Sequence, residues 1–179
     1  GLRDELTAGS GINMTRFFFF FFFTPGFPHF SIDSVVYWPG GLDHYFVYTR
    51  QRSVGNTHLY EMPIEINFSN GLQDTSITVV IDSATNMFHI PIYFMATWIT
   101  IDRNEKVSDA ISSNEKLITT TGSIQVQETN TTLNVLSTGA GPNIVRMEHN
   151  FVPPDPFIGS NPGIRLSDYH YWKVSGIFS

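Results

Sequence analysis

The feature that most constrains this chain is an alternation of apolar and polar residues with a period of two. It is clearest in residues 59–68, where the apolar positions are Met62, Ile64, Ile66 and Phe68. Successive side chains of a β-strand point to opposite faces, so this spacing predicts a strand with one face in a core and the other toward solvent. A proline between the first two apolar positions places the strand at a sheet edge or at a bulge, because proline has no N–H group to donate.

Strand signals of this kind dominate the chain. Segments rich in β-branched and aromatic residues, bounded by turn residues, predict strands at residues 31–38, 42–50, 77–81, 88–101, 118–128, 133–136 and 143–152. Residues 17–23 are seven consecutive Phe closed by a Thr-Pro-Gly turn signal. A run that is apolar on both faces predicts a strand covered on both faces. Residues 104–117 have irregular helical spacing and are expected to form a loop with at most one or two turns.

About eight short strands at intervals of roughly ten to fifteen residues predict an all-β fold, an eight-stranded antiparallel jelly-roll β-sandwich over residues 1–156. The repeated helices that a βαβ fold requires are missing from the pattern. After residue 152, prolines and glycines end the strand pattern, and residues 157–179 are expected to form an aromatic C-terminal extension. Such an extension packs on its own domain or docks on a neighbouring chain, and we favour docking.

The composition indicates a surface with few charges. Charged residues make up 15% of the 179 residues, below the ~25% typical of soluble domains, and aromatic residues also make up 15%. Such a composition is typical of surfaces covered by other chains, although a β-rich core beneath a Ser, Thr and Asn surface would give the same numbers. The net charge is −6 with scattered Lys and Arg, so extensive direct binding to nucleic acid is not expected. The run of seven Phe is too short to span a membrane as a helix.

Neither catalysis nor a bound cofactor is expected. The chain has no cysteine, which excludes disulfides, thiol nucleophiles and cysteine-based zinc sites. Its six histidines form no His-x-His or His-Glu-x-x-His pattern, and no Gly-x-Ser-x-Gly nucleophile elbow occurs. We therefore assign no catalytic residue, no metal ligand and no cofactor-binding residue.

Several segments, taken in order, resemble the capsid proteins of picornavirus-like viruses, including the dicistrovirus and iflavirus types. Residues 36–48 are similar to that family's aromatic–Trp–Arg–Gly–small–Leu–x–Tyr strand pair. Residues 78–83 and 88–94 resemble its strand ending in Asp and the following strand with a Val/Ile–Pro–Tyr-like element. Residues 122–126 and 139–154 are similar to its last strands, which carry an Ala-Gly element and a Pro-Pro exit.

The resemblance extends from Phe17 to Pro154 and has two departures. Pro39 stands where the family usually has Arg, and Pro142 with Asn143 replaces the usual acidic pair. Each motif alone is weak, so the order and spacing of the segments carry the resemblance. The chain is also shorter than most such capsid proteins.

The resemblance implies a structural subunit that assembles with other capsid proteins of the same shell into an icosahedral virion. It implies that genomic RNA is enclosed with little direct binding and that a host receptor binds the shell. It places the protein in the virion and, during assembly, in the host cytoplasm. A glycine at position 1 fits release from a viral polyprotein.

Large aromatic side chains dominate the energetics of protein interfaces, and we expect them to act here as core or interface anchors. The candidate interface residues are Phe17, Phe20, Phe23, Trp38, Trp98, Tyr169, Tyr171 and Trp172. Two other functions fit the same pattern. One is a soluble β-sandwich module that binds carbohydrate or a receptor, and the other is a jelly-roll enzyme.

Overall fold

A computed structural model of the chain describes residues 1–39, 43–55, 58–141, 143–159 and 163–178. This part is mostly β, and every strand pair is antiparallel, so the predicted all-β class is confirmed. The strands are β1 (Phe27–Trp38), β2 (Asp43–Val54), β3 (Met62–Ser69), β4 (Asp74–Ile81), β5 (Thr85–Ile92), β6 (Trp98–Ile101), β7 (Ile111–Ile118), β8 (Gly122–Val126), β9 (Thr131–Val135), β10 (Asn143–Asn150) and β11 (Tyr171–Ile177). They form several small sheets that do not close.

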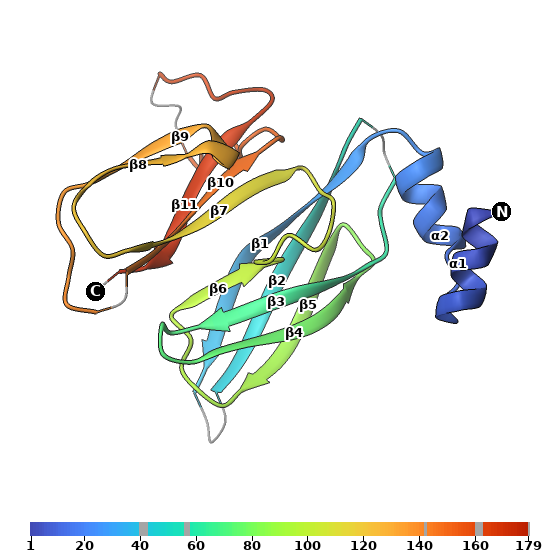
Figure 1. Ribbon diagram of the computed structural model, residues 1–179, viewed down its shortest axis with the longest axis horizontal. Coiled ribbons are helices and arrows are strands. Elements are labelled where there is room, and N and C mark those ends of the chain that lie inside the picture. Colours follow the sequence, from blue (N-terminus) through green and yellow to red (C-terminus); the bar gives the residue numbers. More distant parts are fainter. Residues whose placement is uncertain (40–42, 56–57, 142, 160–162, 179) are drawn as a thin grey trace.

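The strands build two sandwiches (Figure 1). In the first sandwich, the sheet β1-β2-β5 packs on the sheet β4-β3-β6. Its core holds aromatic and branched side chains from both sheets, with Tyr45 and Val47 on one side and Ile66 and Phe68 on the other, each with at most 2% of its surface exposed. These residues stand at alternate positions in their strands, as the period of two predicts.

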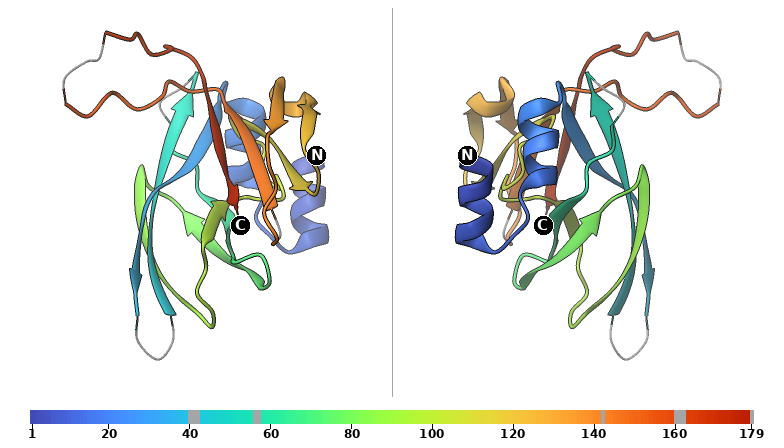
Figure 2. Two further views of the ribbon diagram at one scale, coloured as in Figure 1. Left: turned by 90° about the vertical axis from the view of Figure 1, so that its left-hand side faces the viewer. Right: turned by 90° about the vertical axis from the view of Figure 1, so that its right-hand side faces the viewer.

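In the second sandwich, the sheet β11-β10-β7 packs on the hairpin β8-β9. Its core is smaller and consists of Ile118, Val126, Val145 and Met147, with half-buried side chains around them. The short 3-10 helix Gln127–Thr129 joins the two strands of the hairpin. Figure 2 shows that β10 and β11 run beside the first sandwich.

The face of β10 that points to the first sandwich is polar. It carries Arg146, Glu148 and Asn150, all buried, whereas Val145 and Met147 point the other way into the second core. Polar and backbone groups of the two sandwiches meet along this face, and we call the contact the seam. The seam is formed by Pro28, His29, Trp98, Arg103, Ala110, Ser113, Arg146, Glu148, Asn150 and Ser175.

Hydrogen bonds hold the seam together. The ring Nε2 of His29 lies 2.9 Å from the Oδ1 of Asn150, and the Nε1–H of Trp98 donates to Ser175 Oγ at 3.2 Å. The backbone N–H of Ala110 donates to the carbonyl of Pro28 at 2.7 Å. Because hydrogen bonds require a defined geometry, the seam fixes the orientation of the second sandwich.

The prediction of a strand at residues 17–23 is wrong. This segment continues from α2 (Thr15–Phe18) into a five-residue π-helical turn (Phe19–Phe23), after the N-terminal helix α1 (Leu2–Ser10). Phenylalanine rings one turn apart stack on each other, as Phe18 and Phe22 do at 4.7 Å between ring centroids. A short run that is apolar at every position has no period, so it does not distinguish a strand from a helix.

Two other expectations need correction. Residues 88–101 form two strands in different sheets, β5 and β6, instead of one interrupted strand. Part of the expected loop at residues 104–117 belongs to the strand β7. Its sequence is polar and does not predict a strand, because β7 is held by hydrogen bonds to β10, which is distant in the sequence. Within the segments that resemble capsid proteins, residues 40–42 and Pro142 lie outside the described residues.

The C-terminal extension is also partly a strand. β11 pairs with β10 along its whole length, so Tyr171–Ile177 packs on its own chain, which is one of the two expected arrangements. A side chain at Gly176 would place its Cβ 1.9 Å from the carbonyl oxygen of Ile144. The absence of a side chain at this position therefore lets the two strands approach each other.

Candidate subunit interface

The sheet β1-β2-β5 carries an apolar outer face. Residues that lie opposite each other in an antiparallel pair point to the same side, and Tyr45 and Val47 of β2 point into the core. Phe46 and Tyr48 therefore point outward, together with the residues opposite them in β1 and β5. We call the following set the outer face: Val36, Trp38, His44, Phe46, Tyr48, Met87 and His89.

These seven residues include no carboxylate, lysine or arginine, but Arg50, the next outward-pointing residue of β2, forms ion pairs with Asp33 and Asp155. Trp38 is 64% exposed and Met87 is 53% exposed. The ring of Phe46 stacks on His89 with centroids 4.8 Å apart, and His89 Nε2 lies 2.9 Å from His44 Nδ1. One ring nitrogen of each histidine is thus hydrogen-bonded to the other histidine.

The second half of β1 is exposed on both faces. A bulge shifts the pairing of β1 with β2 between Ile32 and Ser34, and every residue from Asp33 to Trp38 is exposed. Val35 and Tyr37 point to the inner side, but each is still 37% exposed. We call residues 34–38 the free edge, because they extend past the part of β1 that the seam covers.

The N-terminal helices carry a second apolar surface. Phe20 and Phe21 pack on the ring of Tyr60, with ring centroids 5.0 and 5.5 Å apart, and Phe18 is buried. Most of the remaining large apolar side chains of the helical region are exposed: Leu2, Leu6, Ile12, Phe17, Phe19, Phe22 and Phe23. Figure 1 shows that the two helices stand at one side of the first sandwich, away from the second.

A third aromatic cluster lies on the second sandwich. Trp172 of β11 stacks on His149 of β10 at 4.4 Å, and its Nε1–H donates to the carbonyl of Thr129 at 2.9 Å. Nε2 of His149 lies 3.2 Å from Nδ1 of His170. Burial lowers the pKa of His149, and the charge of the neighbouring His170 adds to this shift. Trp172 nevertheless stays 45% exposed.

The structure distributes the eight candidate interface residues over these places instead of bringing them together. Phe17 and Phe23 are exposed on the N-terminal helices, and Phe20 is half-buried there. Trp38 lies on the outer face.

The other four candidates lie in or beside the seam and the second sandwich. Trp98 is 5% exposed and packs under the guanidinium of Arg103, so it is a core residue. Tyr169 and Trp172 are exposed and Tyr171 is half-buried.

Most of the outer face was not predicted from the sequence. Val36, Phe46, Tyr48 and Met87 were not among the candidates. The signal was present in residues 42–50, where aromatic residues occupy positions of both parities, so both faces of that strand had to be apolar.

Two ionisable groups are held in neutral form, His29 in the seam and Asp109 beside it. Burial lowers the pKa of His29 to about 4, although its hydrogen bond with Asn150 acts in the opposite direction. Burial raises the pKa of the half-buried Asp109 to about 8, and the nearby carboxylates of Asp102 and Glu105 add to this shift. Both groups are therefore neutral in the folded chain near pH 7. His29 has released its proton, and Asp109 keeps its proton.

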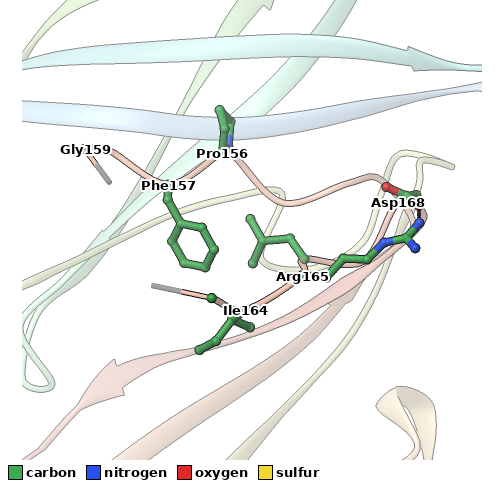
Figure 3. A pocket seen from close by; sticks show the side chains of 8 residues that line it. Pro156, Phe157, Gly159, Ile164, Arg165 and Asp168 are labelled. Carbon is green, nitrogen blue, oxygen red and sulfur yellow. Dashed lines mark hydrogen bonds and ion pairs between the residues drawn. The ribbon is translucent and has the colours of Figure 1, made fainter. Parts of the chain in front are cut away.

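A surface hollow of about 550 Å³ lies in the segment before β11 (Figure 3). Phe157 and Ile164 line it with apolar side chains, and Arg165 points along its rim. Arg165 donates to Asp168 at 2.6 Å, so its charge is already paired within the loop. This arrangement does not present a charged group to a ligand.

Among the residues that the structure describes, no group of three or more His, Asp or Glu side chains is placed to hold a metal ion. Nor does this described part contain a helix long and apolar enough to cross a membrane. No protein-family model, curated protein or solved structure matches the chain.

Proposed function

We propose that the chain is a structural subunit of a viral capsid of the picornavirus-like type, with a jelly-roll organisation, in an icosahedral shell around single-stranded RNA. The observation that carries this proposal is the amount of apolar surface that the chain leaves uncovered. In the described part, exposed large hydrophobic side chains outnumber the buried hydrophobic ones. Monomeric soluble proteins rarely expose apolar patches larger than a few hundred Å², so this surface points to other chains as its cover.

The total surface supports the same conclusion. The chain has 10731 Å² of accessible surface at a mass of 20.2 kDa. A compact monomer of that mass exposes about 8,800 Å². The excess of about 2,000 Å² is on the order of the area that a specific protein–protein interface buries.

The antiparallel sandwiches and the order of the capsid-like segments support the capsid class over other assemblies. The net charge of −6 indicates that this subunit neutralises little RNA phosphate itself. Polyamines, metal ions or other chains of the shell would supply that charge.

The test is electron microscopy and nuclease protection on the purified chain and two variants. Trp38→Lys places a charge on the outer face, and Val80→Lys places one on β4, where Val80 is 50% exposed. We expect the wild type and Val80→Lys to form closed particles that protect RNA, and Trp38→Lys to form none. A stable monomer that binds a defined glycan on an array would contradict the proposal and favour the carbohydrate-binding module.

A further inference from the structure

The free edge of β1 offers backbone groups to another strand. In the described part of the chain, residues 34–38 make backbone hydrogen bonds with β2 on one side and with no strand on the other. At the start of the same strand the chain covers its own edge, since Ala110 N–H donates to the carbonyl of Pro28. An open strand edge is a template for pairing with a further strand.

Most of the other edge strands carry residues that oppose such pairing, and the exceptions are β8 and β9 of the two-stranded hairpin. β5 contains Pro91, which has no N–H group, and β11 contains Lys173. β7 contains Glu115 and Lys116, and β4 begins with Asp74. The short strand β6 lies between β3 and the two strands β1 and β11. Residues 34–38, Ser-Val-Val-Tyr-Trp, contain neither a charge nor a proline.

We infer that the free edge pairs antiparallel with the free edge of a second copy of this chain, about a two-fold axis at Val36. This pairing would extend the three-stranded sheet β1-β2-β5 into a continuous six-stranded sheet. A second copy of the chain is thus one specific partner for the apolar surface that the proposed function requires to be covered. The inference rests on that function.

The register follows from the faces of the strand. A two-fold axis perpendicular to the sheet keeps the inner faces of both copies on one side, so opposed residues must belong to the same face. With the axis at Val36, this residue lies opposite its own copy, and Ser34 lies opposite Trp38. On the inner side, Val35 lies opposite Tyr37.

The opposed residues suit each other in size and charge. Each large aromatic side chain lies opposite a smaller one, and no charged residue faces another. A register centred on Ser34 would run through the bulge at Asp33, whose carboxylate lies 3.0 Å from Arg50. The bulge interrupts the regular spacing of backbone groups that a ladder needs, which disfavours that register.

The absence of native cysteine allows a direct test by disulfide trapping in the full chain. In the proposed register the two copies of Val36 have Cβ atoms about 4.5–5.5 Å apart, close to the about 3.5–4.5 Å of a disulfide. Val36→Cys is therefore expected to give a disulfide-linked dimer under mild oxidation. Most of the chain is expected in the dimer band of a non-reducing gel.

Two matched variants serve as controls. Val80→Cys has almost the same exposure, 50% against 48% for Val36, but lies in the other sheet. Val35→Cys lies in the same strand, yet its two copies are diagonal neighbours about 7–8 Å apart, outside disulfide reach. Both are expected to stay monomeric on the gel. Equal cross-linking of Val36→Cys and Val80→Cys would overturn the inference.

The remaining outcomes separate the inference from the proposed function. If Val36→Cys forms no dimer while the sample still sediments as large particles, the pairing is wrong and the proposed function stands. If it forms no dimer and sediments at the mass of one chain, both are wrong. Val36→Lys provides a second variant that does not depend on oxidation, and it is expected to abolish dimers that Val80→Lys retains.

Discussion

The two sandwiches share antiparallel construction but differ in what stabilises them. The first has a core of fully buried aromatic and branched residues from both of its sheets, such as Tyr45, Ile66 and Phe68. The second has four buried apolar residues, and the opposite face of its central strand β10 is polar. Burial of apolar surface drives folding, so the first sandwich supplies most of the stability. The second depends on the geometry of the seam for its position.

The largest expected effect compares one side chain from each core. Phe68→Ala is expected to lower the free energy of unfolding by about 4 kcal/mol, because it removes a fully buried ring from the larger core. Met147→Ala is expected to lower it by about 2 kcal/mol, because the smaller core can collapse around the gap. Urea denaturation measures both. Equal losses would contradict the difference between the two cores.

The next effect concerns the buried ion pair of the seam. Arg146 is 3% exposed, donates to Glu148 at 2.9 Å and donates to the carbonyl of Arg103 at 2.7 Å. Arg146→Met is expected to cost about 3 kcal/mol, because it leaves the buried carboxylate of Glu148 with only the more distant Lys173.

The double variant Arg146→Met/Glu148→Met is the control for this effect. It removes both charges together, so urea denaturation is expected to show a loss much smaller than that of Arg146→Met alone. If the double variant loses more free energy of unfolding than Arg146→Met, the ion pair stabilises the seam by more than it costs to bury the two charges. The comparison of the two sandwiches must then be revised.

A further effect is the pH dependence that Asp109 gives the region of the seam. Its pKa is about 8 in the folded chain against an ordinary value of 3.8, so the fold keeps a proton that the unfolded chain releases. Stability is therefore expected to fall as pH rises from about 4 to about 8 and to change no further above that. Asp109→Asn should be more stable than the wild type at pH 8 and lack this slope. Asp168→Asn, at an exposed carboxylate, is the control and should keep it.

His29 gives a second pH dependence, with the opposite slope. Its pKa is about 4 in the fold against 6.5 ordinarily, so the unfolded chain gains a proton first as pH falls. As pH falls from 6.5 to about 4, the contribution of His29 to the free energy of unfolding is expected to decrease. This loss offsets the gain that Asp109 gives over the same pH range. His29→Gln should remove this loss, whereas His58→Gln, at an exposed histidine, should not. Urea midpoints at pH 4.5 and 6.5 would reveal the difference, and an identical slope in both variants would contradict it.

The sequence predicted the elements whose side chains alternate between core and solvent. Residues 62–68 of β3 are the best example, because burial on one face imposes the period directly. It failed for β7, where Ser, Asn, Glu and Lys pair with a distant strand and no local period exists. It also failed for the seven Phe, because an unbroken apolar run contains no period that distinguishes a strand from a helix.

The candidate site was predictable in kind but not in place. Aromatic enrichment indicated apolar surface, and Trp38 lies on it. Trp98, chosen for the same reason, is buried beneath Arg103, because residue type alone does not reveal which face of a strand meets the core. The exposure of both faces of β1 over residues 33–38 depends on which other segments cover the strand, and the sequence of one strand does not encode it.

The most direct test of the central claim is sedimentation equilibrium of the purified chain over a range of concentrations at neutral pH. The claim is that the outer face and the free edge are made to be covered by other chains. We predict masses well above 20.2 kDa that rise with concentration and fall toward one chain in Trp38→Lys. A single species of 20.2 kDa at every concentration, with the wild type and the variant alike, would contradict it.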